Sequence, residues 1–191
     1  MSILDIHVLG SPILRAETKI VAEVTDEVRK LADDMFDTMY AAKGIGLAAP
    51  QVGRSERVAV VDVEDQRYAL VNPEIVWEEG SERAEEGCLS IPDIYGDVDR
   101  AQRVLVRALD LEGKQIEIEA TDLLARCLQH EIDHLHGRLF IDYLSFLKRR
   151  AAIGKWEGMR DKYPGLVRKT ALEAESEASR SPAPARADEA L

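Results

Sequence analysis

The sequence of 191 residues predicts an α+β fold. Three segments have the apolar spacing or the capping residues of helices, one towards each end of the chain and one between them. Several runs with the composition of β-strands lie among these segments and are joined by short turns. Strands connected in this way, with helices at the two ends and in the middle, indicate an α+β architecture.

The first predicted helix follows Thr25 or Asp26, either of which can cap its N-terminus. Apolar residues then recur at the spacing of one helix face. They are Val28, Leu31, Ala32, Met35, Phe36 and Met39. We interpret this stripe as a face packed against the core.

The predicted strands are short runs rich in apolar and β-branched residues. They occupy residues 57–63, 68–71, 74–77, 103–109 and 115–120. The last two are expected to pair across a turn at Glu112-Gly113. A second helix should then begin at Thr121 or Asp122 and end at Gly137.

This second helix carries His130-Glu131-Ile132-Asp133-His134. The two histidines are four residues apart and therefore lie on one face, one turn from each other. Both imidazoles can reach a single metal ion, and Glu131 is near enough to exchange a proton with a metal-bound water. The pattern indicates a metallohydrolase, most often a zinc peptidase. The alternative is a chance spacing on a solvated helix, although the chain contains only four His.

A third metal ligand is expected upstream, because no glutamate follows His134 within the span where a thermolysin-like ligand would stand. Cys88 lies in the tight segment 86–90, Glu-Gly-Cys-Leu-Ser. A thiolate with two imidazoles suits a borderline-soft metal, whereas the alternative is an ordinary buried thiol. Cys127 shares the helix stripe of the histidines and is expected to line the site as a small apolar group. Two cysteines do not make a secreted disulfide framework.

Residues 44–51 read Gly-Ile-Gly-Leu-Ala-Ala-Pro-Gln. Two glycines that flank one apolar residue let another backbone approach closely. A phosphate-binding loop is the competing interpretation, but the segment lacks the lysine that such loops need. Gln51 can donate an amide N–H to a developing oxyanion, and taken alone it is more typical of a surface or turn residue.

In this order, the three segments 44–51, 86–90 and 129–134 resemble the peptide deformylase family. The resemblance covers about residues 3–147 and includes the spacings between the segments and Asp-Tyr-Leu-Ser at 142–145. It implies antiparallel β-sheets packed around a central helix that carries the two histidines, with N-terminal and C-terminal helices. It also implies a metal-dependent hydrolase that removes the formyl group from the N-terminal methionine of new polypeptides and releases formate.

The resemblance also implies roles for individual residues. The metal ligands would be Cys88, His130 and His134, with Glu131 as the general base. The donors to the oxyanion would be the Gln51 side chain and the Leu89 backbone N–H. The nascent chain would lie extended along Ile45 and Gly87, and Gly46 would keep that approach open.

The methionine pocket, by matching positions, would be lined by Ile45, Leu123, Cys127 and the ring of His130. Arg126 stands where many members of the family carry an apolar residue. It is expected either to extend its charged head to solvent over the pocket rim or to contact the second substrate residue.

Three further residues match family positions that hold the peptide or support the metal site. Tyr95 occupies a position where some members have a basic residue that helps to hold the peptide. Glu86 and Arg100 match an ion pair that supports the Cys88 segment, and the alternative is two unrelated surface charges.

The expected cofactor is one divalent metal ion. Ligand chemistry alone favours zinc, whereas the resemblance implies Fe(II) in the cell, with Ni, Co or Zn as substitutes. Two rival classes are a zinc endopeptidase and a non-catalytic metal-binding protein. The thiolate at Cys88 argues against the first, and the presence of Glu131 and Gln51 argues against the second.

The net charge of −11 is unevenly distributed. Residues 1–147, the expected catalytic domain, carry −14, and residues 148–170, an expected basic helical extension, carry +6. Residues 171–191 carry −3 and are rich in Ala, Glu, Ser and Pro, so we expect an acidic, disordered tail. An acidic body argues against specific DNA binding.

The C-terminal helix is expected to run from Ser145 to about Lys162 and to end before Pro164-Gly165. Its basic residues suggest a contact with ribosomal RNA, and the resemblance to bacterial members points the same way, so the ribosome is an expected partner beside nascent formyl-Met chains. No apolar run is long enough to span a membrane. The N-terminus has no features of a signal peptide, so a cytoplasmic location is expected.

Overall fold

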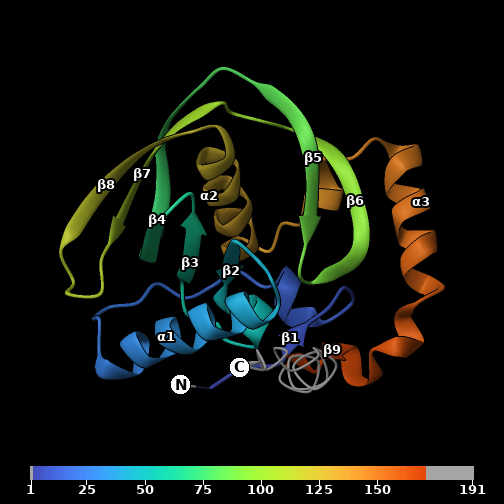
Figure 1. Ribbon diagram of the computed structural model, residues 1–191, viewed down its shortest axis with the longest axis horizontal. Helices are drawn as coiled ribbons and strands as arrows, with labels where there is room; N and C mark the ends of the chain where they lie inside the picture. Colours follow the sequence, from blue (N-terminus) through green and yellow to red (C-terminus); the bar gives the residue numbers. More distant parts are fainter. Residues whose placement is uncertain (1, 171–191) are drawn as a thin grey trace, which may run out of the picture.

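The computed structural model describes residues 2–170. Within this range the helices are α1 (Asp26–Ala41), α2 (Asp122–Leu135) and α3 (Phe146–Glu157), with five short 3-10 helices (Figure 1). The 3-10 helices are Pro12–Arg15, Ala49–Val52, Phe140–Tyr143, Arg160–Lys162 and Pro164–Leu166. None of the described helices is long and apolar enough to cross a membrane. The α+β fold expected from the sequence is confirmed.

The strands form three antiparallel sheets. The largest has the order β2-β3-β4-β7-β8, with bounds Gly46–Ala48, Val58–Val63, Gln66–Glu79, Arg103–Leu109 and Gln115–Thr121. The second is the hairpin of β5 (Glu82–Cys88) and β6 (Ile91–Arg100). The third pairs β1 (Ile6–His7) with β9 (Val167–Arg168), which brings the two ends of the described chain together.

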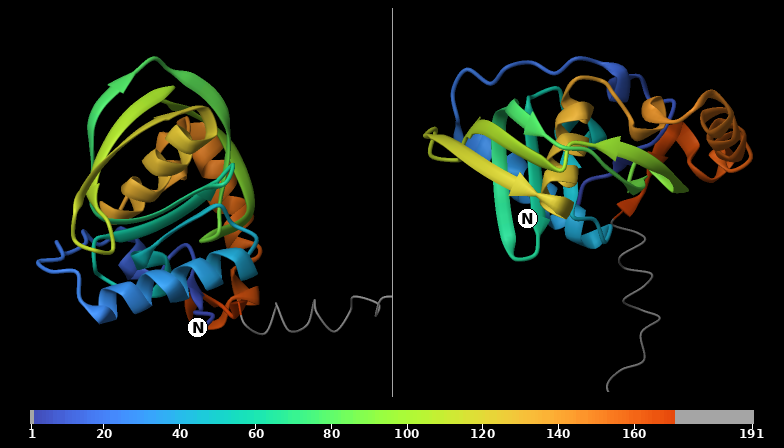
Figure 2. Two further views of the ribbon diagram at one scale, coloured as in Figure 1. Left: turned by 60° about the vertical axis from the view of Figure 1, so that its left-hand side comes forward. Right: turned by 90° about the horizontal axis from the view of Figure 1, so that it is seen from above.

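Helix α2 lies in the space enclosed by the curved five-stranded sheet and the β5–β6 hairpin, as Figures 1 and 2 show. Every residue from Leu124 to Leu135 is buried, including its charged and polar members. A helix that is buried on all sides normally carries apolar residues, so buried polar side chains on α2 need partners or a function. The central helix predicted from the sequence is confirmed.

Helix α1 begins as predicted. Thr25 is its N-cap, and the Thr25 hydroxyl accepts a hydrogen bond from the Val28 backbone N–H at 3.4 Å. All six residues of the predicted apolar stripe are buried. They pack against the faces of β2 and β3, and α1 thereby closes one side of the main sheet (Figure 1).

Strands β7 and β8 have the predicted bounds within one residue, and they pair from Arg103↔Thr121 to Leu109↔Gln115. The prediction of two strands at 68–71 and 74–77 was wrong, because both belong to β4. The sequence between them forms a bulge rather than a turn, with Asn72 at φ 53°. The Asn72 side chain exchanges two hydrogen bonds with the Val21 backbone, at 2.8 and 2.9 Å, and so holds this left-handed residue in place.

The β5–β6 hairpin was not predicted. Its strands contain many acidic residues, and this composition hides the pattern of a strand. Ile91, Ile94 and Val98 of β6 nevertheless point into a hydrophobic cluster beneath α3. β2 was also missed, because its three residues lie inside the glycine-containing segment 44–51.

Helix α2 ends as predicted, with Gly137 at φ 68° just beyond it. A Cβ at Gly137 would lie 2.6 Å from the Arg15 carbonyl oxygen, so only glycine fits there. The expected side-chain cap at the start is absent, because the Thr121 side chain accepts no capping bond.

Helix α3 begins after the N-cap Ser145 and ends at Glu157. The predicted extension to about Lys162 was therefore too long: Gly158 follows the helix, and a 3-10 turn comes next. The buried Trp156 anchors α3 to the cluster that contains Phe140 and Val8, and its ring stacks on Tyr163 at 5.6 Å. The prediction for residues 171–191 lies outside the described part of the chain.

Candidate metal centre

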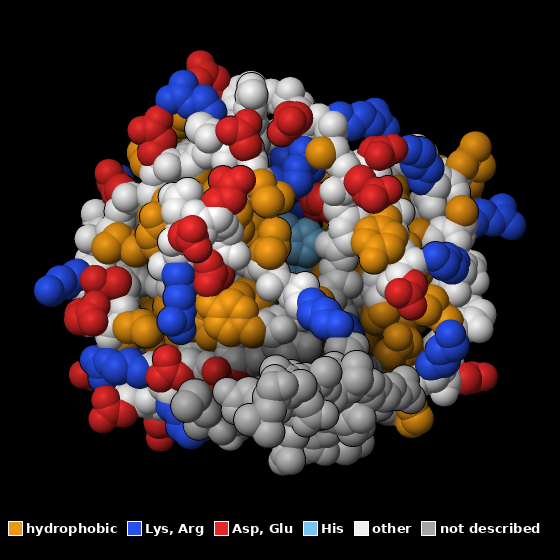
Figure 3. Space-filling model, viewed as in Figure 1, with side chains coloured by type: hydrophobic (Ala, Val, Ile, Leu, Met, Phe, Trp, Pro, Cys, Tyr) orange, Lys and Arg blue, Asp and Glu red, His pale blue; other side chains and the backbone are white. Residues whose placement is uncertain are grey.

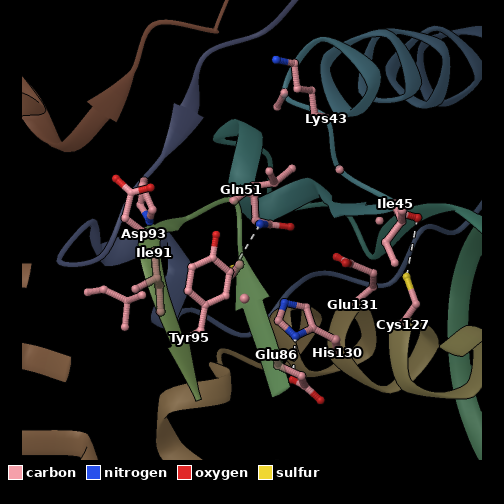
Figure 4. Close-up of a pocket in the computed structure, with 18 of the residues that line it drawn as sticks. Lys43, Ile45, Gln51, Glu86, Ile91, Asp93, Tyr95, Cys127, His130 and Glu131 are labelled. Atoms are coloured by element: carbon pink, nitrogen blue, oxygen red, sulfur yellow. Dashed lines mark hydrogen bonds and ion pairs between the residues drawn. The ribbon is translucent and has the colours of Figure 1, made fainter. Parts of the chain in front are cut away.

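A cavity of about 490 Å³ opens beside the N-terminal half of α2. Its walls come from the segment after α1, from the β5–β6 hairpin and from α2, and the C-terminal segment adds Tyr163 and Arg168. A histidine side chain is visible at the bottom of a hollow in the molecular surface (Figure 3). The close-up in Figure 4 shows Glu131 and His130 reaching this cavity from α2.

Three candidate metal ligands meet beside this cavity, and two of them, Cys88 and His130, line it. One ligand atom each of Cys88, His130 and His134 lies within 4.8 Å of the other two, and they are the one such group among residues 2–170. Cys88 Sγ lies 3.2 Å from His134 Nε2. Cys88 ends β5 and the histidines lie on consecutive turns of α2, so the set depends on how the hairpin packs on the helix.

These residues fit a divalent metal ion. His130 Nδ1 lies 3.0 Å from Glu86 Oε2, a contact that leaves Nε2 of the same ring to face the other ligands. Buried Glu131 has one carboxylate oxygen, Oε2, without a hydrogen-bond partner in the described structure. One thiolate and two imidazoles form an open N₂S set, which suits Zn, Fe, Co or Ni.

The Glu131 side chain lies against β2, the strand that contains Gly46. Burial raises the pKa of its carboxyl group to about 7. A Cβ at Gly46 would collide with Glu131 Oε1 and would lie 2.8 Å from Cys127 Sγ. A Cβ at Gly44 would likewise lie 2.7 Å from Leu89 Cδ1. The two glycines therefore make room for side chains of the site, whereas the sequence suggested that they admit another backbone.

Gln51 lies in the short 3-10 helix Ala49–Val52 and is buried, so it is not a surface residue. Its Oε1 accepts a hydrogen bond from the Ala48 backbone N–H at 2.8 Å. Its Nε2 consequently points towards the ligand group, 3.6 Å from Cys88 Sγ and 3.1 Å from Ser90 Oγ. The bond from Ala48 fixes which end of the amide faces the cavity.

Glu86 is buried, and it connects the strand that ends at Cys88 to His130 on α2. Its carboxylate accepts two hydrogen bonds from Arg100, at 2.9 and 3.0 Å, so the structure contains the ion pair suggested by the sequence. Burial opposes ionisation of Glu86, but the bonds from His130 and Arg100 outweigh it and lower its pKa to about 2. Arg100 also bonds Asp133 on α2 at 2.5 Å, a partner that sequence reasoning did not identify.

Of the two alternatives for Arg126, the extension of its charged head to solvent was wrong. Its side chain neither extends to solvent nor stands free at the pocket rim, because only 6% of the residue is exposed. Nη1 donates to Glu86 Oε1 at 2.8 Å and to the Val98 carbonyl at 2.9 Å, and Nη2 donates to the Glu82 carbonyl at 2.7 Å. A carboxylate and two carbonyls of the hairpin thus hold the guanidinium inside the protein.

The remaining predicted residues line the cavity. Ile45 and Leu123 are about half exposed, with 44% and 46% of their surface accessible. Cys127 is buried, and its Sγ lies 3.6 Å from the Ile45 carbonyl oxygen. Tyr95 is exposed, and its ring packs over Gly87, where a Cβ would lie 2.7 Å from Tyr95 Cε1. Sequence reasoning missed Tyr163 and Arg168, which are too distant along the chain for any local pattern to identify.

The chain matches known proteins over most of its length. Residues 3–150 match the family model described as polypeptide deformylase. The peptide deformylase of Alkalilimnicola ehrlichii is 55% identical over 161 residues, which are 82% of this chain and 90% of that protein. The peptide deformylase of Hydrogenovibrio crunogenus is 56% identical over 160 residues, 82% of this chain and 95% of that one.

Solved structures agree with the sequence matches. A peptide deformylase from Legionella pneumophila is 43% identical with a TM-score of 0.80, and the match covers 95% of this chain and all of that one. A peptide deformylase from Ehrlichia chaffeensis in complex with actinonin is 42% identical with a TM-score of 0.80, covering 83% of this chain and 98% of the other. The Cys-His-His ligand group and these matches lead to one conclusion: the chain belongs to the polypeptide deformylase family.

Proposed function

We propose that this protein removes the formyl group from the N-terminal formyl-methionine of newly synthesised polypeptides and releases formate. The observation that carries the proposal is the meeting of Cys88, His130 and His134 next to an open cavity that buried Glu131 also lines, in a chain of the deformylase family. The reaction is the hydrolysis of an amide. It therefore requires an activated water, stabilisation of the negative charge on the carbonyl oxygen, and a proton for the amine that leaves.

Cys88, His130 and His134 would hold one divalent metal ion. When bound, such an ion polarises the carbonyl and lowers the pKa of a coordinated water towards neutrality. The bond between His130 Nδ1 and Glu86 holds the ring in the orientation in which Nε2 is available as a ligand.

Glu131 acts as the base and later as the acid. Its Oε2 has no other partner in the described structure and takes a proton from the attacking water. The same oxygen returns this proton to the nitrogen of methionine when the C–N bond breaks. Gly46 sets the position of the carboxylate, because β2 can approach Oε1 closely only without a side chain there.

The negative charge that develops on the formyl oxygen would be met by Gln51 and Leu89. The Gln51 amide is already oriented by Ala48, so its Nε2 needs no rearrangement during the reaction. The backbone N–H of Leu89 follows directly after the ligand Cys88 and is the second proposed donor. Gln51 lies in the buried 3-10 helix Ala49–Val52, and the partly buried Leu89 lies between the two strands of the β5–β6 hairpin.

The peptide would lie extended between Ile45 and Gly87, with the methionine side chain against Leu123 and Cys127. The half-exposed Ile45 and Leu123 offer apolar surface to that side chain. Arg126 closes one wall of the cavity but does not present a free charge to the peptide, because Glu86 compensates it.

Release of formate from formyl-Met-Ala-Ser tests the proposal. The expected result is metal-dependent release of one formate per peptide, with no cleavage of casein. Casein digestion in place of formate release would identify a zinc endopeptidase. A protein that binds metal but releases no formate would be a non-catalytic member of the family.

The metal identity gives a separate prediction. We propose Fe(II) as the cellular metal, and we expect faster turnover with Fe(II) or Ni(II) than with Zn(II) when metal-free protein is reconstituted with each ion. The iron form should lose activity in air, because a thiolate and Fe(II) beside an open coordination position are exposed to oxygen. Zinc as the best activator would contradict the prediction.

The ribosome is the proposed partner of the C-terminal segment. Phe146 and Leu147 at the start of α3 are 76% and 75% exposed. Lys148 and Arg149 form ion pairs with the body, at 2.7 Å from Asp97 and 3.2 Å from Asp142. Arg150 and Lys162 are exposed cations of the same C-terminal segment, and a polyanion such as ribosomal RNA attracts such cations through counterion release.

We expect the double variant Arg150→Glu, Lys162→Glu to lose most of its salt-sensitive co-sedimentation with ribosomes while it hydrolyses short formyl peptides at the normal rate. The double variant Lys19→Glu, Lys114→Glu changes the net charge equally on other exposed surface and should sediment as the wild type does. Substitution is preferable to truncation after Leu147, because Trp156 and β9 pack into the body. Equal sedimentation of both variants would refute a specific contact.

A further inference from the structure

The three candidate metal ligands come from two separate parts of the hydrophobic core. Cys88 packs at the edge of the cluster that contains Ile91 and Val98 of the hairpin. Most buried apolar residues of α2, from Leu124 to Ile132, belong to a different cluster, together with residues of the five-stranded sheet. No buried residue is shared between the two clusters in the described structure. The distance from Cys88 to the histidines therefore depends on what joins the hairpin to α2.

Hydrogen bonds between polar side chains connect the hairpin to α2, and Glu86 is the central residue of this network. Glu86 Oε1 accepts hydrogen bonds from Arg100 Nε at 2.9 Å and from Arg126 Nη1 at 2.8 Å. Glu86 Oε2 bonds Arg100 Nη2 and His130 Nδ1, both at 3.0 Å. One carboxylate thus contacts one candidate ligand directly and precedes another, Cys88, by two residues.

Arg126 has a particular place in this network. It lies one helical turn before His130, so both side chains leave the same face of α2 towards Glu86. Its bonds to the Val98 carbonyl at 2.9 Å and the Glu82 carbonyl at 2.7 Å reach both strands of the hairpin. Arg100 already neutralises Glu86 from within the hairpin. Arg126 adds bonds that cross from the helix to the hairpin.

A direct role of Arg126 in holding substrate fits the structure less well. The residue lines the cavity, but it is 6% exposed and three acceptors hold its two terminal nitrogens. Breaking a buried, hydrogen-bonded ion pair to reach a ligand would leave Glu86 without one of its donors, which is costly. The side chain is therefore held in place before any substrate arrives.

We infer that Arg126 is a positioning residue for the metal ligands: it holds Glu86 against His130 and holds the hairpin that carries Cys88 at a fixed distance from α2. The inference rests on the proposed metal-dependent function. The ligand set is organised in advance by a side chain that touches neither metal nor substrate. Partners of this kind change metal affinity by about 10–100-fold when they are removed.

The test is a titration of the metal-free protein with Co(II), read from the thiolate-to-cobalt absorption band, without substrate. We compare the wild type with Arg126→Leu, which removes all three bonds, and Arg126→Lys, which keeps the charge but loses the planar fork. The control is Arg57→Leu. Arg57 is also largely buried and bonds three acceptors, namely Glu17 at 2.8 Å and the hydroxyl and carbonyl of Thr18, both at 3.2 Å.

We expect the dissociation constant of Co(II) to rise about 10–100-fold in Arg126→Leu, by a smaller factor in Arg126→Lys, and not at all in Arg57→Leu. Circular dichroism and gel filtration establish that each variant is folded. If Arg126→Leu does not fold, Arg126→Lys decides the question. Wild-type Co(II) affinity in a folded Arg126 variant would overturn the inference, and a raised KM with unchanged Co(II) affinity would assign Arg126 to substrate instead.

The experiment separates this inference from the proposed function. Co(II) binding by the wild type needs no hydrolysis, so a failure to release formate leaves the comparison of affinities intact. Failure of the wild type to bind Co(II) would overturn the metal site and the inference together. Equal weakening in Arg57→Leu would show that general loss of stability, rather than positioning, controls the affinity.

Discussion

Replacement of Glu131 by Gln is expected to lower formate release by roughly 10²–10⁴-fold while the protein keeps its metal. Gln has the same shape but cannot take up a proton, so the three ligands remain and the base is lost. The carboxylate is buried, and its Oε2 has no hydrogen-bond partner in the described structure. The measurement combines a formate assay with elemental analysis of the same sample.

Glu119→Gln is the control, because Glu119 is exposed and paired with Arg103. This variant should leave the rate of formate release and the metal content unchanged. A buried carboxylate is costly to ionise, so the metal-free Glu131→Gln variant should unfold at a temperature no lower than the wild type. A variant without metal would show that Glu131 is a structural carboxylate and not the base.

Replacement of Cys88 by Ala is expected to remove the metal itself, and activity with it. The two histidines that remain cannot form the three-ligand set of a catalytic site. Loss of a direct ligand should weaken metal affinity by more than the roughly 10–100-fold typical of supporting partners. Elemental analysis after dialysis against a weak chelator measures this loss.

Cys127→Ala is the matched control, because Cys127 also lies beside the cavity but is not part of the ligand group. We expect this variant to keep one metal ion per chain. Stoichiometric metal in dialysed Cys88→Ala would place the third ligand elsewhere.

The sequence by itself determined the elements that have local patterns. The stripe on α1 and the turn between β7 and β8 depend on residues a few positions apart, so propensity and periodicity predict them. The pair His130 and His134 is of the same kind, because the helical repeat alone places both rings on one face. Cys88 was a candidate ligand because of its thiolate chemistry and its tight segment, and the resemblance to the family supported it, but no local rule connects Cys88 to α2.

Only the tertiary structure decided how those pieces meet. Arg126 has the sequence context of an amphipathic helix residue, and it is buried because Glu86 and two hairpin carbonyls, about thirty to forty-five positions away, accept its hydrogen bonds. The hairpin itself was missed, since its acidic strands are stabilised by packing under α3 rather than by propensity.

Gly46 illustrates the same limit. The sequence alone suggested that glycine at position 46 lets another backbone approach closely. In the structure a side chain at this position would collide with the carboxylate of Glu131, which α2 places against it. The free energy of burying a charged or polar group depends on the partners that the fold supplies. Those partners come from distant segments, so local sequence predicts which residues are chemically able to act, and tertiary packing decides which of them are placed to do so.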